Sequence, residues 1–132
     1  MGYTGSDGGA HSTKVGSQMS AELTPFTVIQ TLTNIGREID SMPATIEALD
    51  EAEVNAKAGF DSAYRGAFLR AEGAMDLRKV VAEDAAKEQR LEYELAGVRL
   101  RAAKEQLRVL RDRLEIGRSL GAVLRMEWSG QS

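Results

Sequence analysis

Few side chains in this sequence could carry out acid–base or metal chemistry. The single histidine, His11, lies in a Gly- and Ser-rich stretch with no potential partner beside it, and the chain has no cysteine. Carboxylates cluster at Glu83–Asp84 and within residues 50–53. A helical di-iron site would also need Glu-x-x-His pairs, which the sequence lacks. We therefore predict no enzyme activity, no catalytic residue, no metal and no cofactor.

Basic residues offer the strongest functional signal. Residues 99–125 contain eight basic and three acidic side chains, a net charge of +5 in a chain whose net charge is −3. On a helix, several of them share one sector and could follow a phosphate backbone, with bidentate contacts from arginine. The predicted nucleic-acid-binding residues are Arg101, Lys104, Arg108, Arg111 and Arg118.

Intramolecular neutralisation is the alternative role for this basic segment. If the chain folds back near Gly73, position 50 pairs with about position 99 and position 40 with about position 109. The acidic residues of the first half would then face the basic segment: Asp40, Glu47, Asp50, Glu51 and Glu53. Both interpretations stay open, and both can hold at once.

Two long helices are expected to position these residues. Thr24 and Pro25 are typical of a helix start. Apolar residues then recur at steps of three and four, the seam of a coiled coil, interrupted only by Glu53. This first seam is Val28, Leu32, Ile35, Ile39, Met42, Ile46, Leu49, Glu53, Ala56, Phe60, Ala63 and Ala67. Pro43 allows one kinked helix or two helices with Ser41 as a second N-cap, and a break or sharp kink is favoured.

A tight turn is predicted at residues 73–75, with Gly73 as a C-terminal cap and Asp76 as the next N-cap. A second helix then extends from Leu77 to about Trp128. Its seam is Tyr93, Ala96, Leu100, Ala103, Leu107, Leu110, Leu114, Gly117, Gly121, Leu124 and Trp128. We predict an all-α fold, a long antiparallel helical hairpin (coiled coil) over residues 24–128. We expect residues 1–23 to form a disordered leader or tag-like segment and residues 129–132 to form a tail.

A second apolar stripe on the second helix predicts self-association. It consists of Leu91, Leu95, Val98, Ala102, Val109, Ile116, Leu120 and Val123. Alternatively, a kinked first arm covers this stripe. The predicted homo-oligomer interface is Leu95, Val98, Val109, Ile116, Gly117, Leu120, Gly121 and Val123, in which the two glycines allow close helix approach. Phe60, Tyr64 and Phe68 are expected in the core, and Trp128 near Phe26.

Composition and hydropathy exclude several classes. No apolar run is long enough to cross a membrane. Residues 1–18 lack the apolar region of a secretory signal, so a cytoplasmic protein is expected.

Two segments resemble a known group of proteins. Residues 63–79 (AYRGAFLRAEGAMDLRK) and 107–127 (LRVLRDRLEIGRSLGAVLRME) resemble small helical proteins of actinobacterial siphophages and prophages. The resemblance covers about residues 19–128. The layout is also similar to the recombination mediator of T4-type phages, an oligomeric helical hairpin that helps load a recombinase on single-stranded DNA.

This resemblance implies a phage accessory protein of DNA recombination or replication, in the host cytoplasm. Its partners would be itself and single-stranded DNA, or a recombinase or annealing protein, with no membrane and no small-molecule substrate. The alternative is a structural or assembly coiled-coil protein of the phage that binds no nucleic acid.

Overall fold

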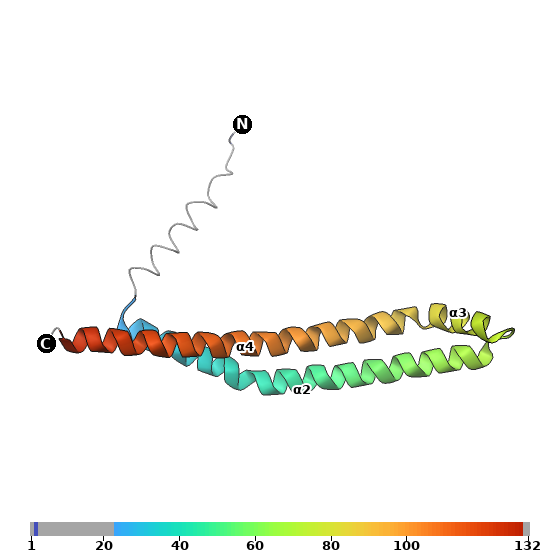
Figure 1. Cartoon of the computed structure of the whole chain (residues 1–132), viewed down its shortest axis with the longest axis horizontal. Helices are drawn as coiled ribbons and strands as arrows, with labels where there is room; N and C mark the ends of the chain where they lie inside the picture. The colour runs from blue at the N-terminus through green and yellow to red at the C-terminus, as the bar shows by residue number, and fades with distance from the viewer. Residues whose placement is uncertain (1, 3–22, 131–132) are drawn as a thin grey trace. The chain divides into compact units, whose positions relative to one another are not determined.

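The computed structural model describes Gly2 and residues 23–130, which are mostly helical and contain no strand. Three helices follow one another: α2 (Pro25–Arg70), α3 (Met75–Ala85) and α4 (Lys87–Gly130) (Figure 1). The predicted all-α class is confirmed. The predicted leader lies outside the described residues except for Gly2 and Leu23, and so do the last two residues of the predicted tail. Ser129 and Gly130, also assigned to that tail, belong to α4.

The predicted start of α2 is confirmed. Thr24 Oγ1 accepts a hydrogen bond from the Thr27 backbone N–H at 3.2 Å, and the Thr24 N–H donates to Thr27 Oγ1 at 3.0 Å. This reciprocal pair satisfies amides that have no partner inside the helix. Pro25 at the first helical position loses no donor that the helix needs.

Of the two arrangements left open at Pro43, the structure has the single helix: α2 continues through Pro43 without a break. Ser41 is no N-cap: its hydroxyl donates to the Glu38 carbonyl at 2.7 Å inside the helix. Proline removes the hydrogen bond to Ile39 and costs about 3 kcal/mol in a helix interior. Burial of Met42, and partial burial of Ile39 and Ile46 on either side, offset that cost.

The turn is formed by residues 71–74. Gly73 has a φ of 104°, as expected of a glycine after a helix end. The predicted N-cap at Asp76 is wrong: Ala74 occupies that position without a side-chain bond, and Asp76 lies in the first turn of α3. In this position the negative charge of its carboxylate still interacts favourably with the positive end of the helix dipole. The second helix is also interrupted once, at Ala86, between α3 and α4.

The chain forms two compact units, and each has its own core. Unit 1 includes residues 23–37 and 112–130, and among these Val28 and Leu124 are buried. In unit 2 (residues 38–111), the buried apolar residues are Met42, Ala67, Ala82, Ala86, Ala96, Leu100, Ala103 and Leu110. Small residues dominate this core, which permits close helix packing.

Nearly all residues of both predicted seams are buried or half-buried. Every residue of the first seam is buried or half-buried, including Glu53. The second seam behaves in the same way up to Leu124, but Trp128 is 55% exposed and Phe26 is 73% exposed. Packing of Trp128 on the first arm near Phe26 is therefore not observed. Both rings lie in unit 1, whose short helical segments bury few side chains.

Candidate functional site

The basic side chains of α4 in unit 2 lie on one face of the helix. Arg101, Lys104, Arg108 and Arg111 follow one another at steps of three and four and are all exposed. We call these four residues the basic face. Arg118, the fifth predicted residue, belongs to unit 1, where it is exposed beside a hollow that it shares with Ile29 and Arg125.

One member of the basic face is already paired. Arg108 Nε donates to Glu105 Oε2 at 3.0 Å, one turn earlier on α4. The hydrogen bond and the charge of this guanidinium lower the pKa of the Glu105 carboxyl below its ordinary value. Glu105 therefore stays ionised and competes with any phosphate for Arg108.

The other three members keep their charges available. Within residues 23–130, no ion pair involves Arg101, Lys104 or Arg111. Acidic Glu53 comes close on α2, since it lines the same hollow as Arg101, but the two form no ion pair. The sequence allowed acidic residues of the first arm to neutralise the basic segment. For Arg101, Lys104 and Arg111, the described residues contain no ion pair of this kind.

An exposed apolar stripe lies on the face of α4 that is turned away from the unit 2 core. Leu91, Leu95 and Val98 are 55%, 42% and 50% exposed, and Ala102 is also exposed. We call these four residues the unit 2 stripe. Val109, further along, is half-buried. The alternative that the first arm covers this surface is therefore wrong for the unit 2 stripe.

In unit 1 the predicted interface residues divide into two groups. Ile116, Leu120 and Val123 are exposed. Gly117 and Gly121 instead lie against α2, where a Cβ on Gly117 would overlap Leu32 and one on Gly121 would lie 3.5 Å from Val28 Cγ1. The close approach expected of these glycines thus occurs within the chain, and they are not part of the exposed surface.

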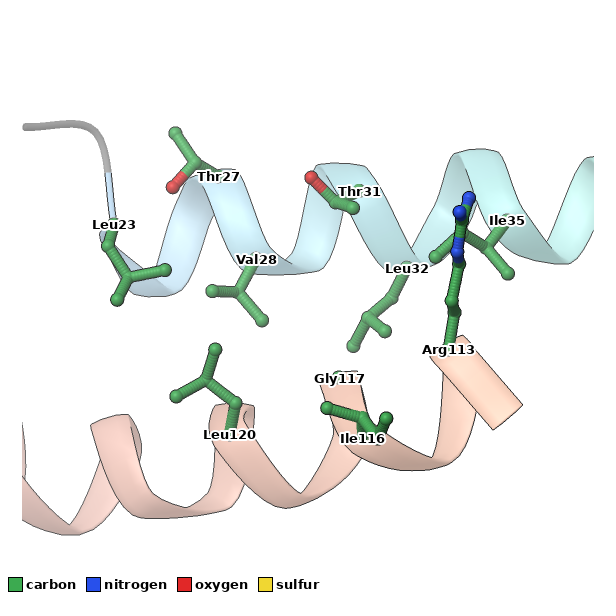
Figure 2. A pocket seen from close by; sticks show the side chains of 10 residues that line it. All are labelled: Leu23, Thr27, Val28, Thr31, Leu32, Ile35, Arg113, Ile116, Gly117 and Leu120. Carbon is green, nitrogen blue, oxygen red and sulfur yellow. The ribbon is translucent and has the colours of Figure 1, made fainter. Parts of the chain in front are cut away.

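A groove of about 410 Å³ lies beside this contact in unit 1. Figure 2 shows Val28 and Leu32 directed toward α4, with Gly117 opposite Leu32 and Leu120 directed toward α2. The walls are mostly apolar, and Arg113 is the charged residue among them. No polar set of the kind that acid–base catalysis uses converges on the groove.

Aromatic rings pack together in unit 2, as expected of core residues. The ring of Phe60 lies 6.4 Å from that of Tyr93, and Tyr64 links Phe60 to Phe68 with centroid separations of 6.2 and 6.3 Å. These distances are typical of stabilising aromatic pairs.

Arg78 is a structural residue that the sequence reasoning missed. Its guanidinium lies 4.4 Å from the centre of the Phe68 ring, and its Nη2 donates to the Phe68 carbonyl at 3.1 Å. This carbonyl belongs to the last turn of α2, where no intrahelical donor remains. No periodic pattern signals a contact across a turn. Buried Ala82 and Ala86, which precede the predicted seam, were also missed, because alanine gives a weak apolar signal.

Comparison with known proteins identified no matching family, curated protein or solved structure. The resemblance to phage proteins therefore stays a prediction. No helix among the described residues is both long and apolar enough to cross a membrane. The same residues hold no group of three or more side chains suited to bind a metal ion.

Proposed function

We propose that this protein is a non-enzymatic helical protein that binds single-stranded DNA through the basic face of α4 in unit 2, with Arg118 of unit 1 as a separate contact. The observation that carries the proposal is the exposure of Arg101, Lys104 and Arg111 without ion-pair partners in the described part of the chain. Repeated cations along one helix face suit a repeated phosphate. The phage setting and the recombination or replication role rest on the resemblance alone, and the proposed cytoplasmic location rests on it together with the apolar pattern of the sequence.

The architecture that we propose for this function is an antiparallel helical hairpin with coiled-coil packing. Two observations support it. In unit 2, Phe60 packs on Tyr93 and Phe68 packs on Arg78. Residues later in the first segment therefore contact residues earlier in the second, so the two segments are antiparallel. Leu32 with Gly117 and Val28 with Gly121 repeat this order in unit 1. The repeat of three and four in both seams is typical of coiled coils.

The test is binding of a fluorescent single-stranded oligonucleotide at two salt concentrations. If four cations each neutralise one phosphate, raising the salt from 50 to 200 mM should lower the affinity by about fifty-fold. Changing Lys104, Arg108, Arg111 and Arg118 together to Glu should abolish binding while the helix content stays unchanged. A matched control reverses four exposed cations elsewhere: Arg37, Lys57, Arg65 and Lys79. Equal loss in both variants, or retained binding in the first, would exclude the basic face as the site.

A structural or assembly protein without nucleic-acid binding is the second candidate. The exposed apolar side chains of α4 favour it, because large exposed apolar patches on soluble proteins mark interaction sites. We propose that the chain self-associates under either function, because Leu91, Leu95 and Val98 of α4 are exposed. A defined oligomer that does not bind DNA at low salt would favour this second function.

A further inference from the structure

We propose that the occupant of the unit 2 stripe is a second copy of this chain, packed antiparallel with its own stripe against the first. This inference rests on the self-association proposed above and adds the orientation, the register and the residues that specify them. The unit 2 stripe supplies Leu91, Leu95, Val98 and Ala102, all exposed on one face of α4.

Spacing makes this stripe a coiled-coil surface. Its residues follow one another at steps of four, three and four, so they take alternate a and d positions of a heptad. The buried seam that contacts α2 lies on the other side of α4, at Tyr93, Ala96, Leu100 and Ala103. A partner helix can therefore reach the stripe without displacing α2.

Charges beside the stripe identify the partner as a second copy. The positions that flank a heptad stripe carry the ion pairs between helices. Glu92 and Glu94 flank its first half, and Arg99 and Arg101 flank its second half; all four are exposed. The surface thus carries both an acidic and a basic half and is complementary to itself. Glu94 also accepts a hydrogen bond from Arg90 at 3.1 Å in its own chain.

The wider charge distribution favours the antiparallel orientation. Residues 84–95 contain four acidic and two basic side chains, whereas residues 98–109 contain four basic and one acidic. A parallel pair would place the two basic segments side by side. An antiparallel pair places each basic segment beside the acidic segment of the other copy, and it also opposes the two helix dipoles.

One register satisfies the apolar and charged positions together. With the twofold axis between residues 96 and 97, Leu95 lies opposite Val98 of the second copy, and Leu91 opposite Ala102. On the flanks, Glu92 faces Arg99 of the second copy. Glu94 likewise faces Arg101 of the second copy, so the symmetric interface holds four opposite-charge pairs.

This interface has defined ends. The next a and d positions after Leu91 and Ala102 are Glu88 and Glu105, and the register places Glu88 opposite Glu105 of the second copy. Apolar contact therefore stops there. Lys87 and Arg108 also approach each other, but each has an acidic neighbour within its own chain, Asp84 at 3.8 Å and Glu105. A contact of about three helical turns is small, so association in the micromolar range is expected.

Charge reversal tests the register by sedimentation equilibrium of the full chain. Glu92→Arg and Arg99→Glu should each raise the dimer dissociation constant about tenfold, because two attractive pairs become repulsive. The double variant restores opposite charges in the antiparallel register and should return close to the wild-type value. In a parallel pair the heptad would bring Arg99 beside Glu94 and Glu92 beside Lys87, so the double variant would stay weak. The control, Lys57→Glu on an exposed part of α2, should have no effect.

Cysteine cross-linking gives an independent reading, since the chain has no cysteine of its own. Leu95→Cys together with Val98→Cys should form a covalent dimer on mild oxidation. Rapid cross-linking of Leu95→Cys alone would show parallel packing and overturn the register. If the wild-type chain stays monomeric at about 100 micromolar, the proposed self-association is wrong. If both charge-reversal variants associate as tightly as the wild-type chain, the chain self-associates through a different surface, and the proposed interface is wrong.

Discussion

Gly117 and Gly121 show how two residues of one type, four positions apart, can differ in their tolerance of a methyl group. A Cβ on Gly121 would make ordinary contact with Val28, whereas one on Gly117 would overlap Leu32. Alanine stabilises a helix by about 1 kcal/mol relative to glycine. Gly121→Ala should therefore raise the free energy of unfolding by up to about 1 kcal/mol.

Gly117→Ala should be less stable than Gly121→Ala, because Leu32 must move to accept the methyl group. Thermal unfolding followed by circular dichroism measures both. Gly59→Ala is the control, since a Cβ there meets no atom within 4 Å. If both unit 1 variants gain as much as the control, Leu32 does not pack against Gly117 as described.

The Glu105–Arg108 pair gives a second prediction at the residue scale. The folded carboxyl has a lowered pKa, so the ion pair persists as the pH falls and is lost only as it passes through that lowered value. Arg108→Ala should return the pKa of Glu105 toward its ordinary value in an NMR titration. Glu105→Gln should remove this competing carboxylate and tighten oligonucleotide binding. Weaker binding by Glu105→Gln would contradict a phosphate contact at Arg108.

At the scale of the element, α2 shows how burial can override local propensity. Pro43 is exposed and cannot donate to Ile39, yet the helix continues on both sides. Pro43→Ala should restore that hydrogen bond and raise the free energy of unfolding by about 1–3 kcal/mol. Urea denaturation is the measurement, with Ala44→Gly as a control of the opposite sign. A less stable Pro43→Ala would mean that α2 does not continue through this position.

At the scale of the whole molecule, α4 carries two surfaces with different proposed partners. The unit 2 stripe is proposed to bind a second copy, and the basic face is proposed to bind DNA. Arg101 flanks both surfaces, so pairing with Glu94 of the second copy leaves Lys104, Arg108 and Arg111 for DNA in the dimer. A dimer would then present two basic faces to one strand, which raises the effective concentration of the second contact.

Leu95→Gln tests this coupling without changing any charge. It should weaken both self-association and the affinity for an oligonucleotide long enough to span two basic faces. A short oligonucleotide that contacts one face should bind with unchanged affinity. The folded chain should tolerate the change, since Leu95 is 42% exposed. Equal losses for short and long oligonucleotides would indicate that the two surfaces are not independent.

The sequence by itself determined the helical class, the start of α2, the glycine turn and the two seams. These features depend on local chemistry: a capping pair at Thr24 and Thr27, a positive φ at Gly73, and an apolar repeat that matches the helix period. For the same reason, most of the exposed basic face could be read from spacing alone.

Only the tertiary structure decided which surfaces of the helices are covered. It placed Gly117 and Gly121 against α2, left the unit 2 stripe exposed and continued α2 through Pro43. Arg78 reached the Phe68 carbonyl across the turn. Each of these outcomes depends on contacts between residues distant in the chain. Helical periodicity tells which side chains share a face, but the partner that covers the face is set by packing.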